Sequence, residues 1–157
     1  MVTLSGGCQC GTVRYRFSGS PGEAAICHCR MCQKAFGSWG AALVPMAAAQ
    51  LTWTRDAAAE FRSSSIVSRG FCRYCGTPLY MREDGDPNFE IAIGTLDEPN
   101  AVTPVEQTGV ESELIWFKAL ADLPRRTTGA GASVDYLARL ATHQHPDHDT
   151  EHWSGHG

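Results

Sequence analysis

Seven cysteines in three short clusters constrain this sequence more than any other feature. The clusters read Cys8-x-Cys10, Cys27-x-Cys29-x-x-Cys32 and Cys72-x-x-Cys75. An odd number of cysteines leaves one thiol over in a disulfide framework, and clustered cysteines in a reducing compartment more often bind metal. The outer two clusters together supply four sulfurs, enough for one closed site, and the middle cluster keeps three. The spacing therefore predicts two metal sites with different numbers of ligands.

The rest of the chain predicts an all-β domain. With 157 residues and 43% hydrophobic residues, it is long and apolar enough for one domain with its own core. Polar and apolar residues alternate in segments 13–17 and 89–93, which is typical of half-buried strands. Further strands are expected at 24–26, 40–45, 51–54, 65–71, 77–82 and 114–117, separated by glycine and proline turns. Residues 57–61 are expected to form one helical turn.

The composition changes near residue 128. We expect a zinc-binding catalytic-type domain over residues 1–128, followed over 129–157 by a short helix and a flexible polar tail. Five of the six histidines lie in that tail. Histidine-rich tracts can bind metal, but a solvated tail without fixed geometry is the favoured interpretation.

Charge and hydropathy exclude several classes of partner. Thirteen basic residues against seventeen acidic ones give a net charge of −4, which argues against a nucleic-acid arm or a polybasic membrane anchor. The longest charge-free stretch, residues 35–54, contains two glycines and a proline and is a poor membrane span. The N-terminus lacks the basic and apolar regions of a signal peptide, so a cytoplasmic location is expected.

The outer two clusters predict a structural zinc site. Residues i and i+2 of a strand face the same side, so Cys8 and Cys10 on a strand would present both sulfurs in one direction. Cys72 and Cys75 form a knuckle, and Gly76 provides the backbone freedom that follows it. Four thiolates at about 2.3 Å make a tetrahedral zinc site with no open position. The alternative is a redox pair at Cys72 and Cys75, without zinc.

The middle cluster predicts a zinc site with an open position. Cys27, Cys29 and Cys32 supply three ligands, and catalytic zinc sites usually have three protein ligands. An incoming thiol would suit the fourth position, because coordination holds it as the nucleophilic thiolate. His28, between two cysteines that face one way, is expected to point away. Met31 is expected to be a packing residue. The sequence leaves open how fully this second site is occupied.

Several other side chains have two possible roles. Arg30 and Lys34 could offset thiolate charge or hold a substrate carboxylate, or they could be solvated surface residues. Arg69 and Arg73 could likewise balance thiolate charge or face water. Gly70 and Phe71 could flank the pocket or simply turn the chain. The remaining large aromatic residues are expected in the core, namely Tyr15, Phe17, Trp39, Trp53 and Trp116.

Four segments resemble the glutathione-dependent formaldehyde-activating enzyme family, which also includes centromere protein V-like proteins. They are GCQCGTVRY at 7–15, CHCRMCQK at 27–34, FCRYCGTPL at 71–79 and GTLD at 94–97. The resemblance implies an Mss4-like fold of short antiparallel strands with two zinc sites. It implies a structural zinc held by Cys8, Cys10, Cys72 and Cys75. It also implies a second zinc, on Cys27, Cys29 and Cys32, where glutathione acts.

The activity implied by the resemblance is that of a carbon–sulfur lyase. In the family, glutathione condenses with formaldehyde to S-hydroxymethylglutathione, so glutathione or another small thiol and a small aldehyde are the expected partners. Segment 111–124 lacks the histidine and the Pro-Trp pair that family members often show around a late strand. Two alternatives remain. One is a related enzyme with a different thiol, and the other is a non-catalytic zinc-stabilised binding module. Chromatin binding, suggested by the centromere-protein kinship, is disfavoured by the charge.

Overall fold

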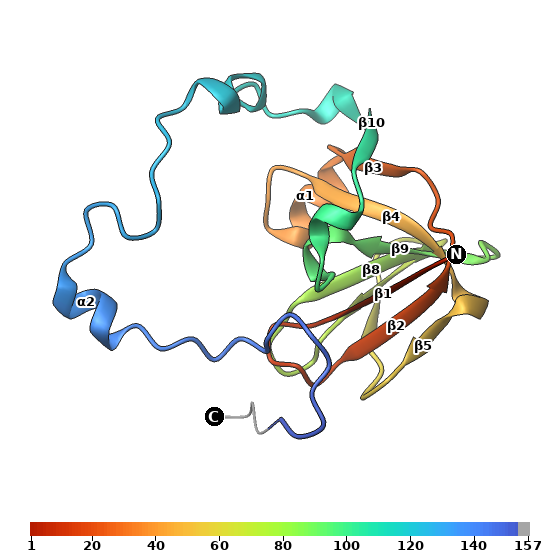
Figure 1. The fold of residues 1–157 in the computed structure, drawn as a ribbon. Helices are drawn as coiled ribbons and strands as arrows, with labels where there is room; N and C mark the ends of the chain where they lie inside the picture. The colour runs from red at the N-terminus through yellow and green to blue at the C-terminus, as the bar shows by residue number, and fades with distance from the viewer. Residues whose placement is uncertain (154–157) are drawn as a thin grey trace.

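Two β-sheets make up the body of the protein (Figure 1). The computed structural model describes residues 1–153. One sheet has three antiparallel strands in the order β1-β2-β5, and the other has seven in the order β10-β3-β4-β9-β8-β7-β6. Among the strands of residues 1–153, only β10 pairs in parallel, with β3, and an isolated parallel bridge also joins Val13 to Asp56. The strands are β1 (Val2–Gly7), β2 (Arg14–Gly19), β3 (Ala24–Cys27), β4 (Ala41–Ala47), β5 (Leu51–Trp53), β6 (Ala59–Arg62), β7 (Val67–Phe71), β8 (Pro78–Glu83), β9 (Asn88–Ala92) and β10 (Pro104–Thr108).

Helices are short and few. The described residues contain two α-helices, α1 (Arg30–Phe36) and α2 (Val134–Arg139), and five short 3-10 segments at Ala48–Gln50, Ile93–Thr95, Pro99–Ala101, Val110–Ser112 and Phe117–Asp122. Over residues 1–153, none of the helices is both long and apolar enough to cross a membrane. The prediction of a mostly-β fold is therefore confirmed.

The core forms where the two sheets pack face to face. Tyr15 and Phe17 alternate along β2 and are fully buried, as the period-2 pattern predicted. They share one apolar cluster with Val44 of β4, Leu79 of β8 and Ile91 of β9. Burial of such side chains contributes roughly 1.5–3 kcal/mol each. This packing holds the three-stranded sheet on the larger one.

Two local predictions were wrong. Residues 57–61 were expected to be helical, yet β6 pairs with β7 as the edge strand of a hairpin, because ladder hydrogen bonds outweigh intrinsic helix propensity, which is a small term even for alanine. Residues 114–117 were expected to form a strand, but a turn there leads into a 3-10 segment. Phe117 instead packs on His28, with ring centroids 4.5 Å apart. The late strand is β10.

A buried ion pair ties β2 to the loop after β9. The Arg14 side chain is 3% exposed, and its guanidinium donates to both carboxylate oxygens of Asp97 at 2.7 and 2.6 Å. The hydroxyl of Ser5, on β1, donates to the same carboxylate at 2.6 Å. Burial raises the pKa of Asp97, but the bonds from Arg14 and Ser5 outweigh it and hold that pKa below its usual value.

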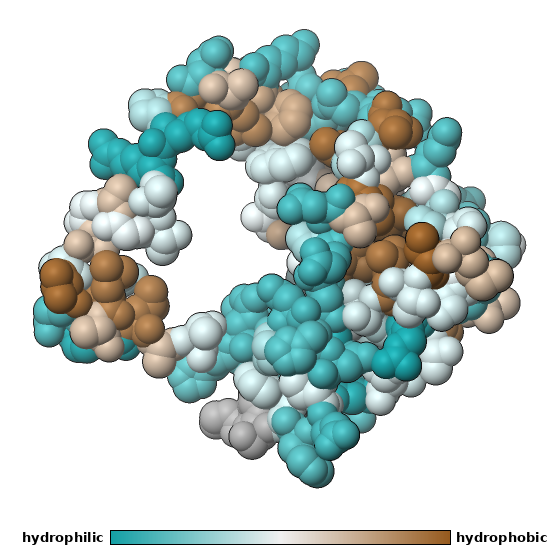
Figure 2. Space-filling view, viewed as in Figure 1, coloured by the Kyte–Doolittle hydropathy of each residue, from teal (hydrophilic) through white to brown (hydrophobic). Residues whose placement is uncertain are grey.

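The chain leaves the body after the 3-10 segment at Phe117–Asp122 and returns near its end. Figure 2 shows open space between the body and the connecting segment that carries α2. Helix α2 buries no residue, and Val134 at its start is 86% exposed. Residues 144–153 then lie against the turn between β1 and β2 (Figure 1). His156, the last histidine of the expected tail, lies outside the described residues.

Replacement of Asp97 tests the ion pair. In Asp97→Asn, the buried Arg14 charge loses its bidentate partner, so we expect the free energy of unfolding to fall by about 3 kcal/mol. Urea denaturation at fixed zinc concentration measures this change. Asp84→Asn, which breaks the exposed pair with Arg62, is the control and should barely move the midpoint. Equal effects of the two variants would contradict the assignment.

Candidate metal centres

The first cluster joins two distant turns of the chain. Cys8 and Cys10 lie in the turn after β1, and Cys72 and Cys75 lie in the knuckle between β7 and β8. All four sulfurs are within 4.8 Å of one another. The Cys8 and Cys10 sulfurs are 3.5 Å apart, and those of Cys10 and Cys72 are 3.7 Å apart. Tetrahedral zinc with Zn–S bonds of about 2.3 Å places its sulfurs about 3.8 Å apart. The donor set therefore fits zinc.

The placement of Cys8 and Cys10 corrects one expectation. They were expected on a strand, but the strand ends at Gly7, and the chain turns through Gly11, at φ +74°. The turn aims both sulfurs at the knuckle. Gly76 follows the knuckle at φ +76°, which confirms the predicted need for glycine there.

Hydrogen bonds from backbone and hydroxyl groups shift the pKa values of the thiols in the first cluster. Burial raises the pKa of Cys75, but hydrogen bonds with Thr77 and Cys10 outweigh it and lower that pKa to about 6. Burial raises the pKa of Cys8 well above its usual value, although the Val13 N–H lies 3.3 Å from its sulfur. A bound cation would favour the thiolate form of Cys8, which burial disfavours.

The second cluster lies where β3 runs into α1. Cys27 ends β3, Cys29 caps the helix, and Cys32 lies in its first turn. Their sulfurs lie within 4.8 Å of one another, and among residues 1–153 no further cysteine, histidine or carboxylate joins them. The Cys29 sulfur accepts from the Cys32 N–H at 3.4 Å. The same short segment therefore starts the helix and gathers three sulfurs.

Arg69 balances charge at the second cluster. It reaches across from β7, is only 7% exposed, and places Nη2 at 3.5 Å from the Cys32 sulfur. Of the two roles considered for Arg69, the structure supports charge balance. Burial raises the pKa of Cys32 to about 12 despite this guanidinium. At Cys29, burial acts in the same direction, but hydrogen bonds from Cys32, Cys27 and Met31 outweigh it and lower the pKa.

His28 and Met31 lie outside the second cluster. His28 points away from the sulfurs, as predicted, and its Nε2 lies 2.8 Å from the Gln107 side-chain oxygen. Its ring packs against both Trp39 and Phe117, with centroids at 5.9 and 4.5 Å, and those two rings also contact each other at 4.7 Å. Met31 was expected to be a packing residue, but it is 49% exposed. The short helix therefore leaves about half of the Met31 side chain open to solvent.

An apolar pocket of about 510 Å³ adjoins the second cluster. Helix α1 contributes Arg30, Met31 and Lys34, and β7 contributes Arg69, Gly70 and Phe71. Gly70 and Phe71 therefore flank the pocket, which was one of their two possible roles. The cluster cysteines themselves do not line the pocket, and the side chain of Arg69, which does, links it to the Cys32 sulfur at 3.5 Å.

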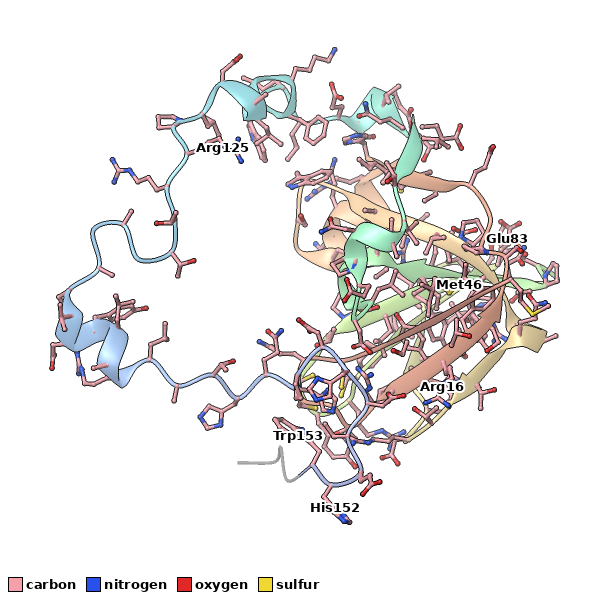
Figure 3. All side chains as sticks on the ribbon, in the orientation of Figure 1. Arg16, Met46, Glu83, Arg125, His152 and Trp153 are labelled. Atoms are coloured by element: carbon pink, nitrogen blue, oxygen red, sulfur yellow. The ribbon has the colours of Figure 1, made fainter. Side chains whose placement is uncertain are left out.

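Residues 145–153 of the tail cover the first cluster, and no sequence pattern predicted this contact. The side chain of His145 is buried, with 4% of the residue exposed, and its backbone N–H donates to the Gln9 carbonyl at 2.8 Å. The indole of Trp153, shown below the β1–β2 turn in Figure 3, donates to the Cys10 carbonyl at 2.6 Å. Asp149 accepts from Arg14 at 2.8 Å and from Arg16 at 2.5 Å. The expectation of solvated tail histidines thus fails at His145, since Gly11 leaves room for its ring.

Removal of the tail tests whether the tail protects the first cluster. A chain ending at residue 142 loses the contacts of His145, Asp149 and Trp153, so we expect a chelator to extract metal from the first cluster several-fold faster. A chromogenic zinc chelator measures the rate. Tyr136→Ala, on the outlying helix α2, should leave the rate unchanged. An unchanged rate in the truncated chain would show that the tail does not protect the cluster.

Comparison with known proteins identifies the family. A family model described as "Glutathione-dependent formaldehyde-activating enzyme" matches residues 3–112, and no curated protein matches significantly. A crystal structure of a Rhodobacter sphaeroides protein shares the fold with a TM-score of 0.54 and 21% identity, covering 66% of this chain and 99% of that one. The matched residues are more than half of the chain and contain all seven cysteines. The chain therefore belongs to the glutathione-dependent formaldehyde-activating enzyme family.

Proposed function

We propose that this protein joins a small thiol of the glutathione type to a small aldehyde, using zinc at the second cluster. The observation that carries the proposal is the difference between the clusters. The first has four sulfurs, and the second has three beside a pocket. A closed four-thiolate set is typical of structural zinc, and three protein ligands are typical of catalytic zinc.

The residues divide into two sets with separate roles. Cys8, Cys10, Cys72 and Cys75 hold a structural zinc, and Cys27, Cys29 and Cys32 hold the zinc that serves the reaction. When bound at the second cluster, zinc supplies an open coordination position in which a substrate thiol is kept as its thiolate. Three cysteine thiolates around a divalent ion leave a net charge of −1, which suits delivery of a thiolate better than generation of hydroxide.

The side chains around the second cluster prepare it for this role. The guanidinium of Arg69, 3.5 Å from the Cys32 sulfur, compensates the negative charge of the thiolates. The Cys32 N–H fixes the Cys29 sulfur at the start of α1. His28 takes no part, because its ring lies on the far side, against Phe117. The site thus contributes position and charge rather than a histidine base.

The reaction needs little beyond positioning. One S–C bond forms between the thiol sulfur and the carbonyl carbon, the C–O π bond breaks, and the thiol proton ends on the new hydroxyl oxygen. This addition also occurs unaided in water. Holding the two reactants together in the pocket can therefore account for a rate advantage, and the same residues would serve the reverse cleavage.

Replacement of Cys29 by serine tests the proposal. Serine is a preferred helix cap, so Cys29→Ser removes one sulfur ligand and keeps the start of α1 intact. We expect the rate of S-hydroxymethylglutathione formation to fall to the uncatalysed rate, because the second site loses its zinc. Exchange NMR spectroscopy of glutathione with formaldehyde measures this rate, and elemental analysis should fall from two zinc ions per chain to one.

Cys75→Ser in the first cluster is the matched control. That variant should lower the thermal midpoint strongly, because loss of structural zinc removes folding free energy, whereas Cys29→Ser should change it little. If Cys29→Ser kept the full rate, the second cluster would not be catalytic, and a zinc-stabilised binding module would become the better account.

A further inference from the structure

The pocket beside the second cluster has a wall suited to an apolar ligand. Helix α1 supplies Met31 and Phe36, and the β6–β7 hairpin supplies Phe61 and Phe71. Met31 is 49% exposed and Phe61 is 63% exposed, so two large apolar side chains face solvent there. Covering them would contribute roughly 25 cal/mol for each Å² removed from water. The wall therefore favours a ligand with an apolar body, which the single carbon of formaldehyde cannot provide.

The same pocket is lined by three cationic side chains, and in the described chain no aspartate or glutamate lines it. Arg69 is the innermost of the cations, at 7% exposure. Its Nε donates to the Ser63 hydroxyl at 3.2 Å and its Nη2 lies near Cys32, but Nη1 is buried without a hydrogen-bond partner. A buried cationic N–H without a partner is costly, and a carboxylate is the group that pairs best with guanidinium.

We infer that one of the two reactants carries an apolar body and a carboxylate. The apolar body occupies the pocket between Phe61 and Met31, and the carboxylate accepts a hydrogen bond from Arg69 Nη1. This inference rests on the proposed function and narrows its substrate class to an aryl or alkyl carboxylate that bears a thiol or an aldehyde.

Glutathione itself fits this wall poorly. The three cations can pair with its two carboxylates, but its peptide groups and ammonium need further hydrogen-bond partners, and burying such groups unpaired is unfavourable. The pocket offers few neutral partners besides Ser63 and Tyr80. The Tyr80 hydroxyl already donates to Glu60 at 2.8 Å. If glutathione is the thiol, the pocket therefore receives the other reactant, and the aldehyde carries the apolar carboxylate.

Binding of an unreactive probe tests the pocket separately from catalysis. We expect 4-methylbenzoate to bind to the full-length zinc-loaded protein, and 4-methylbenzamide, its neutral analogue, to bind at least about tenfold more weakly, as expected for loss of a charged hydrogen bond. Calorimetric titration measures both. Equal affinity of the two probes, or no binding of 4-methylbenzoate, would overturn the inference whatever the outcome for glutathione and formaldehyde.

Two variants locate the probe. Phe61→Ala should weaken 4-methylbenzoate binding about tenfold, because it removes one apolar wall. Ile66→Ala is the matched control, since Ile66 is half exposed on the same hairpin and does not line the pocket. Arg69→Met should abolish the preference for the acid over the amide. Equal weakening by Phe61→Ala and Ile66→Ala would contradict the assigned position.

Rate measurements then show whether the thiol or the aldehyde carries the apolar carboxylate. We expect acceleration over the uncatalysed reaction for 4-formylbenzoate with glutathione, or for 4-(sulfanylmethyl)benzoate with formaldehyde, and a lower KM than for glutathione with formaldehyde. Acceleration of glutathione with formaldehyde alone would overturn the inference and leave the proposed function standing. Conversely, Cys29→Ser should still bind 4-methylbenzoate, so failure of the proposed function would not hide the pocket.

Discussion

The convergence of four sulfurs from two distant turns is the constraint on which the architecture depends. The β1–β2 turn belongs to the three-stranded sheet, and the β7–β8 knuckle belongs to the seven-stranded sheet. Bringing Cys8 and Cys10 to Cys72 and Cys75 therefore joins the two sheets at the ends of these strands, and the apolar core between the sheets holds the rest. A metal at this point would close a loop of about 60 residues, whose entropic cost is only a few kcal/mol.

The second cluster is assembled within one local segment rather than from distant turns. Its three sulfurs come from one short segment at the junction of β3 and α1, so the cluster closes no long loop and contributes little to the architecture. Distant segments supply the surroundings of the second cluster. Strand β7 contributes the Arg69 guanidinium, and the β6–β7 hairpin contributes an apolar pocket wall. In the proposed function, stability and chemistry are assigned to separate cysteine sets, so that one set could change without loss of the other.

The tail shows how a polar segment can gain a defined position without a hydrophobic face. Arg14 and Arg16 lie on the outer face of β2, and Asp149 bridges both. Close approach of the tail also depends on Gly11, because a Cβ there would lie 2.3 Å from the His145 ring. None of these contacts has a periodic sequence signal, since each pairs residues more than 130 positions apart.

The sequence by itself determined the strand-rich fold, the division of the cysteines into four and three, and the orientation of His28. Local spacing controls all of these, because side-chain alternation and short Cys-x-Cys and Cys-x-x-Cys intervals act within a few residues. Only the tertiary structure decided that residues 59–62 form an edge strand, that Phe117 packs on His28, that Met31 stays exposed and that the tail covers the first cluster. Those outcomes depend on partners supplied by distant segments, such as the β7 ladder for β6 and the β1–β2 turn for Trp153, and a local pattern contains no information about them.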